Sequence, residues 1–379
     1  MGHSRSLEVV GPFKGASGYD RHTREFVRQL VRQGVRVRLT HLPGWSVDLP
    51  DALRETWFDT LAAPVGADTL LHFTMPNHAW PRAGLRNVNY TMFEADRIPR
   101  RWADCARAHD LVILPTVSSY EAWARGGVPR ERLRICPLGV DGAFFSAPAE
   151  PLPVQTPAGR PLDSYRTRFL NVAELRPRKN HLGLLRSWIR ATSPADDAIL
   201  LLKVSVFQEG VFEEFRADVA SMQRRLGRTL ADAAPVVLIA QTLTNELVRS
   251  LYAAATHYLS MSRGEGWDQA MMEAAAAGLQ LVAPRHTAYL SYLRDEDSFL
   301  IPATLRPVEF EGTMGLADRV FFDGLGWWEP DEEAAVEIIR RIVRGEAAPK
   351  GSPRSRIVGE YTWERAAARL IEILWEGRA

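Results

Sequence analysis

Two glutamates eight residues apart are the side chains whose spacing best suits chemistry. Glu265 stands in a glycine-containing run, and Glu273 lies in the alanine-rich stretch that follows. The alanines predict a helix, so Glu265 should lie in the loop that enters the helix and Glu273 about two turns inside it, near one side of a cleft. Carboxylates accept hydrogen bonds from hydroxyls. One acid therefore suits a sugar and the other a ribose.

Two further loops carry groups that suit an anion. Gly15 and Gly18 precede an expected helix from Tyr19 to Gln33. Glycines there let the backbone and the helix N-terminus approach an anion, although an ordinary turn explains the loop equally well. Arg178 and Lys179 precede another expected helix and suit a diphosphate, Arg as a fork and Lys as a compact charge. A solvated basic turn is the alternative for this second loop.

The elements that must position these groups alternate between short apolar runs and longer amphipathic stretches, which predicts parallel sheets with crossover helices. Expected strands include 36–39, 69–73, 88–92 and 111–114, and the pattern restarts at 169–173. Residues 148–166 are rich in proline and small residues and read as a linker. We expect two α/β domains, 1–147 and 167–361, with ligands beyond the carboxyl ends of their strands.

Composition excludes several classes of protein. The chain has 379 residues, which favours two domains, and a formal charge of +1, which argues against a general nucleic-acid binder. Its two cysteines are too few for a disulfide scaffold. Without an apolar signal core or a membrane-length apolar run, the expected location is cytoplasmic. The oligomeric state stays open.

Taken together, these motifs resemble family 4 of the retaining glycosyltransferases, whose GT-B fold consists of two facing Rossmann-like domains. The run from Glu265 to Glu273 matches the family's E-x7-E motif. The other landmarks follow the family's order over nearly the whole chain: Gly15–Gly18, Val128–Asp141, Arg178-Lys179, Glu246–Tyr252 and Ser262–Gly266. The last segment, residues 362–379, looks like the family's final helix, which crosses back to the first domain.

The resemblance implies a role for each candidate. Glu273 falls where the family binds ribose hydroxyls, and Glu265 where it contacts the donor sugar. Arg178 and Lys179 fall where cations neutralise the diphosphate leaving group. Glycines would bring the first domain's backbone to the phosphate or acceptor, and backbone amides would complete the donor pocket. These binding positions are Gly15, Gly18, Gly266, Trp267, Asp268 and Gln269.

Other positions depart from the family's pattern or stay open. Glu174 stands where an arginine commonly assists the diphosphate, and Asp268 stands where glycine is frequent. The histidine that many relatives place near the reacting sugar has no clear counterpart. Glu94 is the best polar candidate beside the acceptor, with a structural salt bridge as the alternative. Lys203, at a strand end, has either a pocket role or a structural one.

The leading hypothesis is a retaining hexosyltransferase that moves a sugar from a nucleoside-diphosphate donor to an acceptor hydroxyl of a glycan, a lipid-linked sugar or a small glycoside, as in polysaccharide biosynthesis. Its candidate catalytic residues are Glu265, Lys179, Arg178 and Glu94. The resemblance implies no metal and no cofactor, since the nucleotide sugar is the substrate. Asp295-Glu296-Asp297 spells the D-x-D of metal-dependent transferases, but we interpret it as a solvated acidic turn.

Alternatives from other classes remain open. One is a catalytically silent subunit that binds a nucleotide sugar, and the others are a sugar-nucleotide 2-epimerase and a phosphorylase of the same architecture. Peripheral membrane contact at the inner face is a separate question. The expected helix from Tyr19 to Gln33 carries four arginines around an apolar stripe, which either packs on a sheet or lies on anionic lipid.

Overall fold

The chain folds into two compact units, each built around a six-stranded sheet, in a computed structural model that describes residues 5–206 and 209–376. Unit 1 consists of Met1–Phe93, Arg97–Val140 and Glu360–Ala379, and unit 2 of Glu94–Asp96 and Asp141–Gly359. The proline-rich residues 148–166 belong to unit 2, where the Leu152 N–H donates to the Ser250 carbonyl at 2.9 Å.

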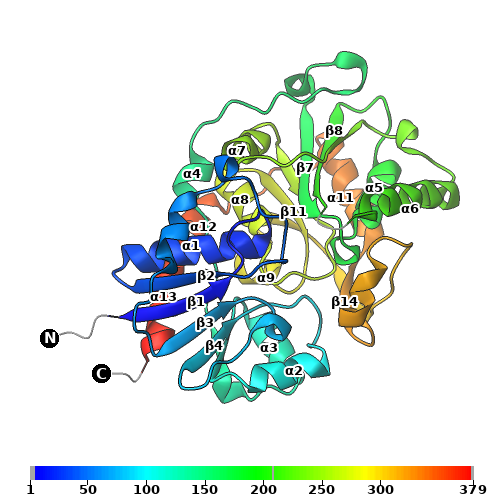
Figure 1. The fold of residues 1–379 in the computed structure, drawn as a ribbon. Helices are drawn as coiled ribbons and strands as arrows, with labels where there is room; N and C mark the ends of the chain where they lie inside the picture. Colours follow the sequence, from blue (N-terminus) through cyan, green and yellow to red (C-terminus); the bar gives the residue numbers. More distant parts are fainter. Residues whose placement is uncertain (1–4, 207–208, 377–379) are drawn as a thin grey trace. The chain divides into compact units, whose positions relative to one another are not determined.

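The sheet of unit 1 is parallel, in the order β2-β1-β3-β4-β5-β6 (Figure 1). Its strand order reverses between β1 and β3, so this unit is doubly wound. The strands are β1 (Ser6–Gly11), β2 (Arg36–His41), β3 (Thr69–Phe73), β4 (Arg86–Tyr90), β5 (Leu111–Leu114) and β6 (Leu133–Ile135). The helices are α1 (Gly18–Arg32), α2 (Arg100–Arg107), α3 (Val117–Arg125) and α13 (Trp363–Trp375), with 3-10 turns η1 (Asp51–Leu53), η2 (Thr56–Ala62), η3 (Pro76–His78) and η4 (Arg130–Arg132).

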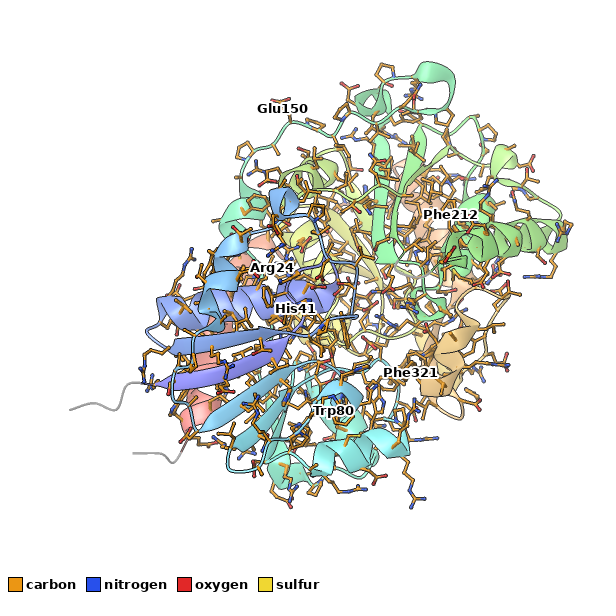
Figure 2. All side chains as sticks on the ribbon, viewed as in Figure 1. Arg24, His41, Trp80, Glu150, Phe212 and Phe321 are labelled. Carbon is orange, nitrogen blue, oxygen red and sulfur yellow. The ribbon has the colours of Figure 1, made fainter. Side chains whose placement is uncertain are left out.

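Helix α1 shows how the amphipathic pattern is used. A capping box of Ser17 and Asp20 starts the helix, and its buried face includes Phe26, Val27 and Leu30. The Phe26 ring lies 5.5 Å from that of Trp363 on α13. Arg24, labelled in Figure 2, donates to the carbonyls of Phe13 and Gly15 at 2.8 and 2.7 Å. The apolar stripe of α1 is therefore covered by protein, and at least one arginine of its basic face is engaged.

The last segment of the chain joins unit 1 through a close backbone crossing. Val140 pairs with Thr362 as an isolated parallel bridge. Next to it, a Cβ added at Gly139 would lie 2.2 Å from the backbone nitrogen of Trp363. Only glycine lets the two strands of backbone approach this closely.

The sheet of unit 2 is also parallel, in the order β12-β11-β10-β7-β8-β9. Its strands are β7 (Thr167–Glu174), β8 (Ala198–Ser205), β9 (Val236–Ile239), β10 (His257–Leu259), β11 (Gln280–Pro284) and β12 (Ser298–Ile301). The helices of its core are α5 (His181–Ala191), α6 (Val211–Leu226) and α11 (Glu332–Arg344) on one face of the sheet, and α4 (Gly142–Ser146), α7 (Asn245–Ala253) and α8 (Gln269–Ala277) on the other (Figure 1). Shorter elements are α9 (Tyr289–Tyr292), α10 (Arg319–Phe322), η5 (Pro157–Gly159), η6 (Leu162–Ser164), η7 (Pro177–Lys179), η8 (Leu230–Asp232) and η9 (Leu316–Asp318), and α12 (Arg354–Glu360) leads back towards α13.

An antiparallel hairpin, β13 (Ala303–Pro307) and β14 (Gly326–Pro330), is added between β12 and α11. The buried carboxylate of Asp218 on α6 anchors its connecting segment, because it accepts from the backbone N–H groups of Thr313 and Met314 at 2.8 to 2.9 Å. The hairpin is thus fixed to the core of unit 2.

Between residues 5 and 376, leaving aside 207 and 208, no helix is both long enough and apolar enough to cross a membrane.

Candidate functional site

The site in unit 2 forms where its strand order reverses, between β7 and β10. Ligands of open α/β sheets bind beyond the carboxyl ends of strands at such a point. The loop after β7 carries Arg178 and Lys179, and the loop after β10 runs from Ser260 to Asp268. The two loops meet directly, because the N–H of Arg263 donates to the carbonyl of Arg178 at 2.7 Å.

Both cations of the first loop pair with the first glutamate of the motif. Lys179 Nζ lies 2.6 Å from Glu265 Oε1, and Arg178 Nη1 lies 3.0 Å from Glu265 Oε2. The Glu265 side chain is only 4% exposed. Arg178 Nη1 also donates to the Gly264 carbonyl at 3.0 Å. The sequence placed these three groups in one site, and the structure brings them into contact.

The charges of this cluster shift each other's pKa. Burial alone would raise the pKa of Glu265, but Lys179 and Arg178 outweigh it and lower that pKa to about 2. Burial opposes the charge of Arg178 as well, yet Glu94 and Glu265 raise its pKa. Glu265 therefore stays ionised throughout the physiological pH range.

Glu94 reaches the same cluster from the short segment Glu94–Asp96. Its Oε1 lies 3.4 Å from Arg178 Nη2, and the side chain is largely buried. Asp96 fixes the segment to unit 2, because its Oδ1 accepts from the Gly326 N–H at 2.6 Å. Burial raises the pKa of Glu94, against the opposing charge of Arg178. Glu94 is thus salt-bridged and also positioned beside the groups proposed to meet the donor.

Asp268 begins helix α8 in a conformation that is unusual for a residue with a side chain. Its φ is 63°, in the left-handed region where glycine is favoured. Asp268 Oδ1 caps the helix by accepting from the Met271 N–H at 3.3 Å, and Oδ2 accepts from the Tyr289 hydroxyl at 2.7 Å. Burial, and next the charge of Glu265, raise its pKa.

Helix α8 starts later than the sequence predicted. Its first residue is Gln269, so Glu273 lies about one turn inside the helix and not two. The carboxylate is 3% exposed, and its Oε2 accepts from the Tyr252 hydroxyl of α7 at 3.0 Å. Gly266 and Trp267 are buried in the loop before the helix, and Gln269 is half-buried.

Residues with an unfavourable backbone conformation are concentrated around the cluster. Among the residues that the structure describes, the non-glycine residues with positive φ are Asn180, Asp268 and Thr287. Asn180 follows Lys179 directly and caps α5. Thr287 Oγ1 accepts from the Glu265 N–H at 3.3 Å. Such conformations persist only where the surroundings enforce them, and they gather at functional sites.

Glu174 does not act as an isolated negative charge. Its Oε1 lies 2.7 Å from Arg176 Nε, and Arg176 Nη1 lies 2.9 Å from Asp318 Oδ1 in the hairpin segment. Either Arg176 or Arg178 could take the place of the arginine that the resemblance implies at Glu174. In this structure Arg176 pairs with Glu174 and Asp318, whereas Arg178 and Lys179 pair with Glu265, the candidate contact of the donor sugar.

Two further predicted residues are placed as follows. Lys203 on β8 is 8% exposed and donates to the Val204 carbonyl at 2.7 Å. Burial lowers its pKa to about 8. The acidic run at 295–297 is a turn in which Asp295 and Glu296 are exposed, as expected, whereas Asp297 is 6% exposed and pairs with Arg356. Within the described part of the chain, no three His, Cys, Asp or Glu side chains are grouped to hold a metal ion.

The glycine loop lies at the strand reversal of unit 1, but two of its amides are already used. Asp20 Oδ1 accepts from the Gly15 N–H at 2.7 Å, and Oδ2 accepts from the Ser17 N–H at 3.1 Å. A Cβ at Gly15 would lie 2.0 Å from Ser46 Oγ, whereas Gly18 has open space around it. Close packing explains Gly15, and Asp20 fills the place of an anion at this loop.

Sequence reasoning missed the tyrosines of α9, which hold the loop after β10. Tyr289 Oη donates to Asp268 and lies 2.7 Å from Ser260 Oγ, and Tyr292 donates to the Trp267 carbonyl at 2.7 Å. A usable signal was present. The two tyrosines have i,i+3 spacing just beyond a strand that neighbours β10, so both face one side of a turn.

Chemically, the site offers a buried pair of cations, a carboxylate that they orient, and two more carboxylates on and at the start of α8. Cations suit phosphate oxygens, and carboxylates suit hydroxyl donors. The arrangement can therefore bind a ligand that carries both.

No protein-family model matches this chain, and comparison with curated protein sequences gives no match. Solved structures do resemble it over nearly their whole length. Sucrose-phosphate synthase from Thermosynechococcus elongatus is 15% identical, with 98% of each chain covered and a TM-score of 0.68. HepE from Anabaena, in complex with UDP and glucose, is 12% identical, with 98% of this chain and 99% of that chain covered and a TM-score of 0.66. An α,α-trehalose-phosphate synthase (UDP-forming) from Burkholderia xenovorans, in complex with glucose-6-phosphate, is 13% identical, with 98% and 99% covered and a TM-score of 0.64.

At these identities the likeness establishes the fold. The predicted class, α/β with two Rossmann-like units of the GT-B type, is confirmed.

Proposed function

We propose that the protein is a retaining, metal-independent glycosyltransferase that uses a nucleoside-diphosphate sugar. The observation that carries this proposal is the buried contact of Glu265 with Lys179 and Arg178 at the strand reversal of unit 2, with Glu273 further along α8. Phosphate, sugar and ribose would each meet a suitable group there. The structural neighbours include proteins solved with UDP and glucose, which supports the same donor class.

Donor binding would rearrange the ion pairs of the site. The diphosphate would compete with Glu265 for Lys179 and Arg178, and the carboxylate so released would accept from the sugar's hydroxyls. The two cations would then stabilise the charge that develops on the leaving diphosphate. Transfer would follow a front-face route, in which the acceptor attacks from the side that the diphosphate leaves. The departing phosphate oxygen would take the acceptor's proton, so no side chain needs to form a covalent bond with the sugar.

A catalytically silent subunit would be favoured if Glu174 repelled the diphosphate. Glu174 pairs with Arg176, so this acid does not face a phosphate alone. An epimerase or a phosphorylase would use the same donor site and is separated by its products.

The proposal is tested by binding and by product analysis. We expect at least one of uridine, guanosine, adenosine and thymidine diphosphates to raise the melting temperature, because a ligand that binds only the folded state stabilises it. With the matching nucleotide sugar and an acceptor mixture, the product should keep the donor's anomeric configuration. Absence of any nucleotide-induced shift contradicts the donor site. An inverted product contradicts retention, and an epimerised donor or phosphate-dependent cleavage replaces transfer.

Donor binding should also take up protons. Burial already raises the pKa values of Glu94 and Asp268, and the negative charge of an added diphosphate would raise both pKa values further. Affinity should therefore increase as pH falls from the pKa values of the bound state to those of the free state. Calorimetry of a nucleotide sugar in buffers of different ionisation enthalpy measures the uptake. We expect Glu94→Gln to reduce it, and proton release on binding would contradict the prediction.

A further inference from the structure

Asp268 places a further carboxylate at the end of the loop after β10, and hydrogen bonds hold it there. The helix cap to Met271 and the hydrogen bond from Tyr289 together fix both of its oxygens. Tyr289 is fully buried. The neighbouring charges of Glu265 and Lys179 act on Asp268, so these three groups share one electrostatic environment. Asp268 thus lies on the same loop as Glu265, the group proposed to contact the donor sugar, and their charges act on each other.

Acids outnumber cations in this region. Around the two loops, salt bridges join Glu94 and Glu265 to Arg178, Glu265 to Lys179, Glu174 and Asp318 to Arg176, and Glu329 to Arg263, while Asp268 and Glu273 accept hydrogen bonds from tyrosines. Arg176 is held by Glu174 and Asp318. Arg178 and Lys179 are the cations that a diphosphate would use. Arg263 is held by Glu329, and Lys203 donates to the Val204 carbonyl, so these two cations are engaged as well.

The charge balance bears on the sugar itself. An uncharged sugar offers hydroxyl donors, which carboxylates bind well. A uronate sugar replaces one hydroxymethyl group with a carboxylate, which would lie among like charges in a buried setting where Coulomb repulsion is weakly screened. We propose that Asp268, together with Glu265, makes the site selective for donors whose sugar is uncharged. This inference rests on the proposed function and names the substrate class of the same site.

Matched donor pairs test the selectivity. UDP-glucose and UDP-glucuronate differ only in the oxidation state of the sugar's C6, and GDP-mannose and GDP-mannuronate form a second such pair. Dissociation constants are measured by calorimetry at pH 8 with the whole protein. We expect the neutral sugar of the pair that binds to be preferred by about tenfold or more, because the added carboxylate meets like charges.

Variants assign the preference to Asp268. Asp268→Asn keeps a good helix cap and tolerates a positive φ, and Asp268→Gly keeps the backbone conformation. Both should reduce the preference at least about threefold, because each removes one of the repelling charges. The control is Asp331→Asn, which changes another cap, that of α11, outside the loops after β7 and β10. It should leave the preference unchanged.

The possible failures are distinct. Equal or tighter binding of the uronate donor overturns the inference while leaving the proposed function intact, and so does an unchanged preference in both Asp268 variants. If no nucleotide sugar of either pair and no nucleoside diphosphate binds, the proposed function itself fails and the inference fails with it.

Discussion

Lys179→Met is expected to slow sugar transfer by about 100-fold or more while weakening donor binding much less. Removing one preorganised group that stabilises developing charge typically costs 10²- to 10³-fold in kcat. The variant keeps Arg178, which lies 3.0 Å from Glu265 in the wild type and can still bind the diphosphate in the ground state. The loss should therefore be concentrated in kcat. Steady-state kinetics and calorimetric donor binding on the same preparation separate the two quantities.

The matched control for this variant is Lys350→Met. Lys350 also lies in unit 2 and donates to the Asp295 carbonyl at 2.7 Å, outside the loops after β7 and β10 that form the site. The Lys350→Met change removes the same charge and adds the same side chain as Lys179→Met, but at a position outside the site. Its kcat should therefore stay within about twofold of the wild type, as for most surface substitutions. A Lys179→Met enzyme that keeps a third of the wild-type kcat would show that this lysine does not stabilise the leaving group.

Glu273→Ala is expected to weaken nucleotide binding by about tenfold to 100-fold, since hydrogen bonds to a charged group contribute about 1.5–3 kcal/mol. Folding should be retained, because the Tyr252 hydroxyl that donates to Glu273 also lies 3.1 Å from the Ala270 carbonyl. Glu337→Ala is the control. That glutamate lies on the exposed side of α11 and pairs with Arg340, so its loss should not affect nucleotide binding.

A change in the ligand identifies which contact Glu273 makes. If it binds the ribose hydroxyls, the wild type should prefer a nucleoside diphosphate over its 2′-deoxy counterpart by about tenfold, one charged hydrogen bond. Glu273→Ala should lose most of that preference, because the group that reads the hydroxyl is gone. If the preference survives in the variant, Glu273 contacts another part of the ligand.

The fold followed largely from local patterns. Apolar runs such as 69–73 and 111–114 became strands with the expected limits, because a parallel strand buried on both faces needs a continuous apolar stretch. The strand predicted at 88–92 is shifted, and β4 ends at Tyr90. Thr91 and Met92 lie beyond it, where the Tyr19 hydroxyl accepts from the Met92 N–H at 3.1 Å. A tertiary contact, which periodicity does not register, sets that end.

The sequence predicted which residues belong to the candidate site better than it predicted the contacts between them. Spacing and order placed Glu265, Glu273, Arg178 and Lys179 in one candidate site. Whether the carboxylate and the cations touch could not be read from the chain, because Lys179 and Glu265 are 86 residues apart. Their distance depends on β7 and β10 lying side by side, which only the pairing of the sheet decides.

The sequence by itself determined two Rossmann-like units and the loops that carry charge, since residue type and periodicity act locally along the chain. Tertiary structure alone decided that α8 begins at Gln269, that Asp268 adopts a positive φ, and that Glu265 pairs with both cations. These features depend on side chains from distant strands and on burial. Burial makes an unpaired charge costly enough to fix its partners.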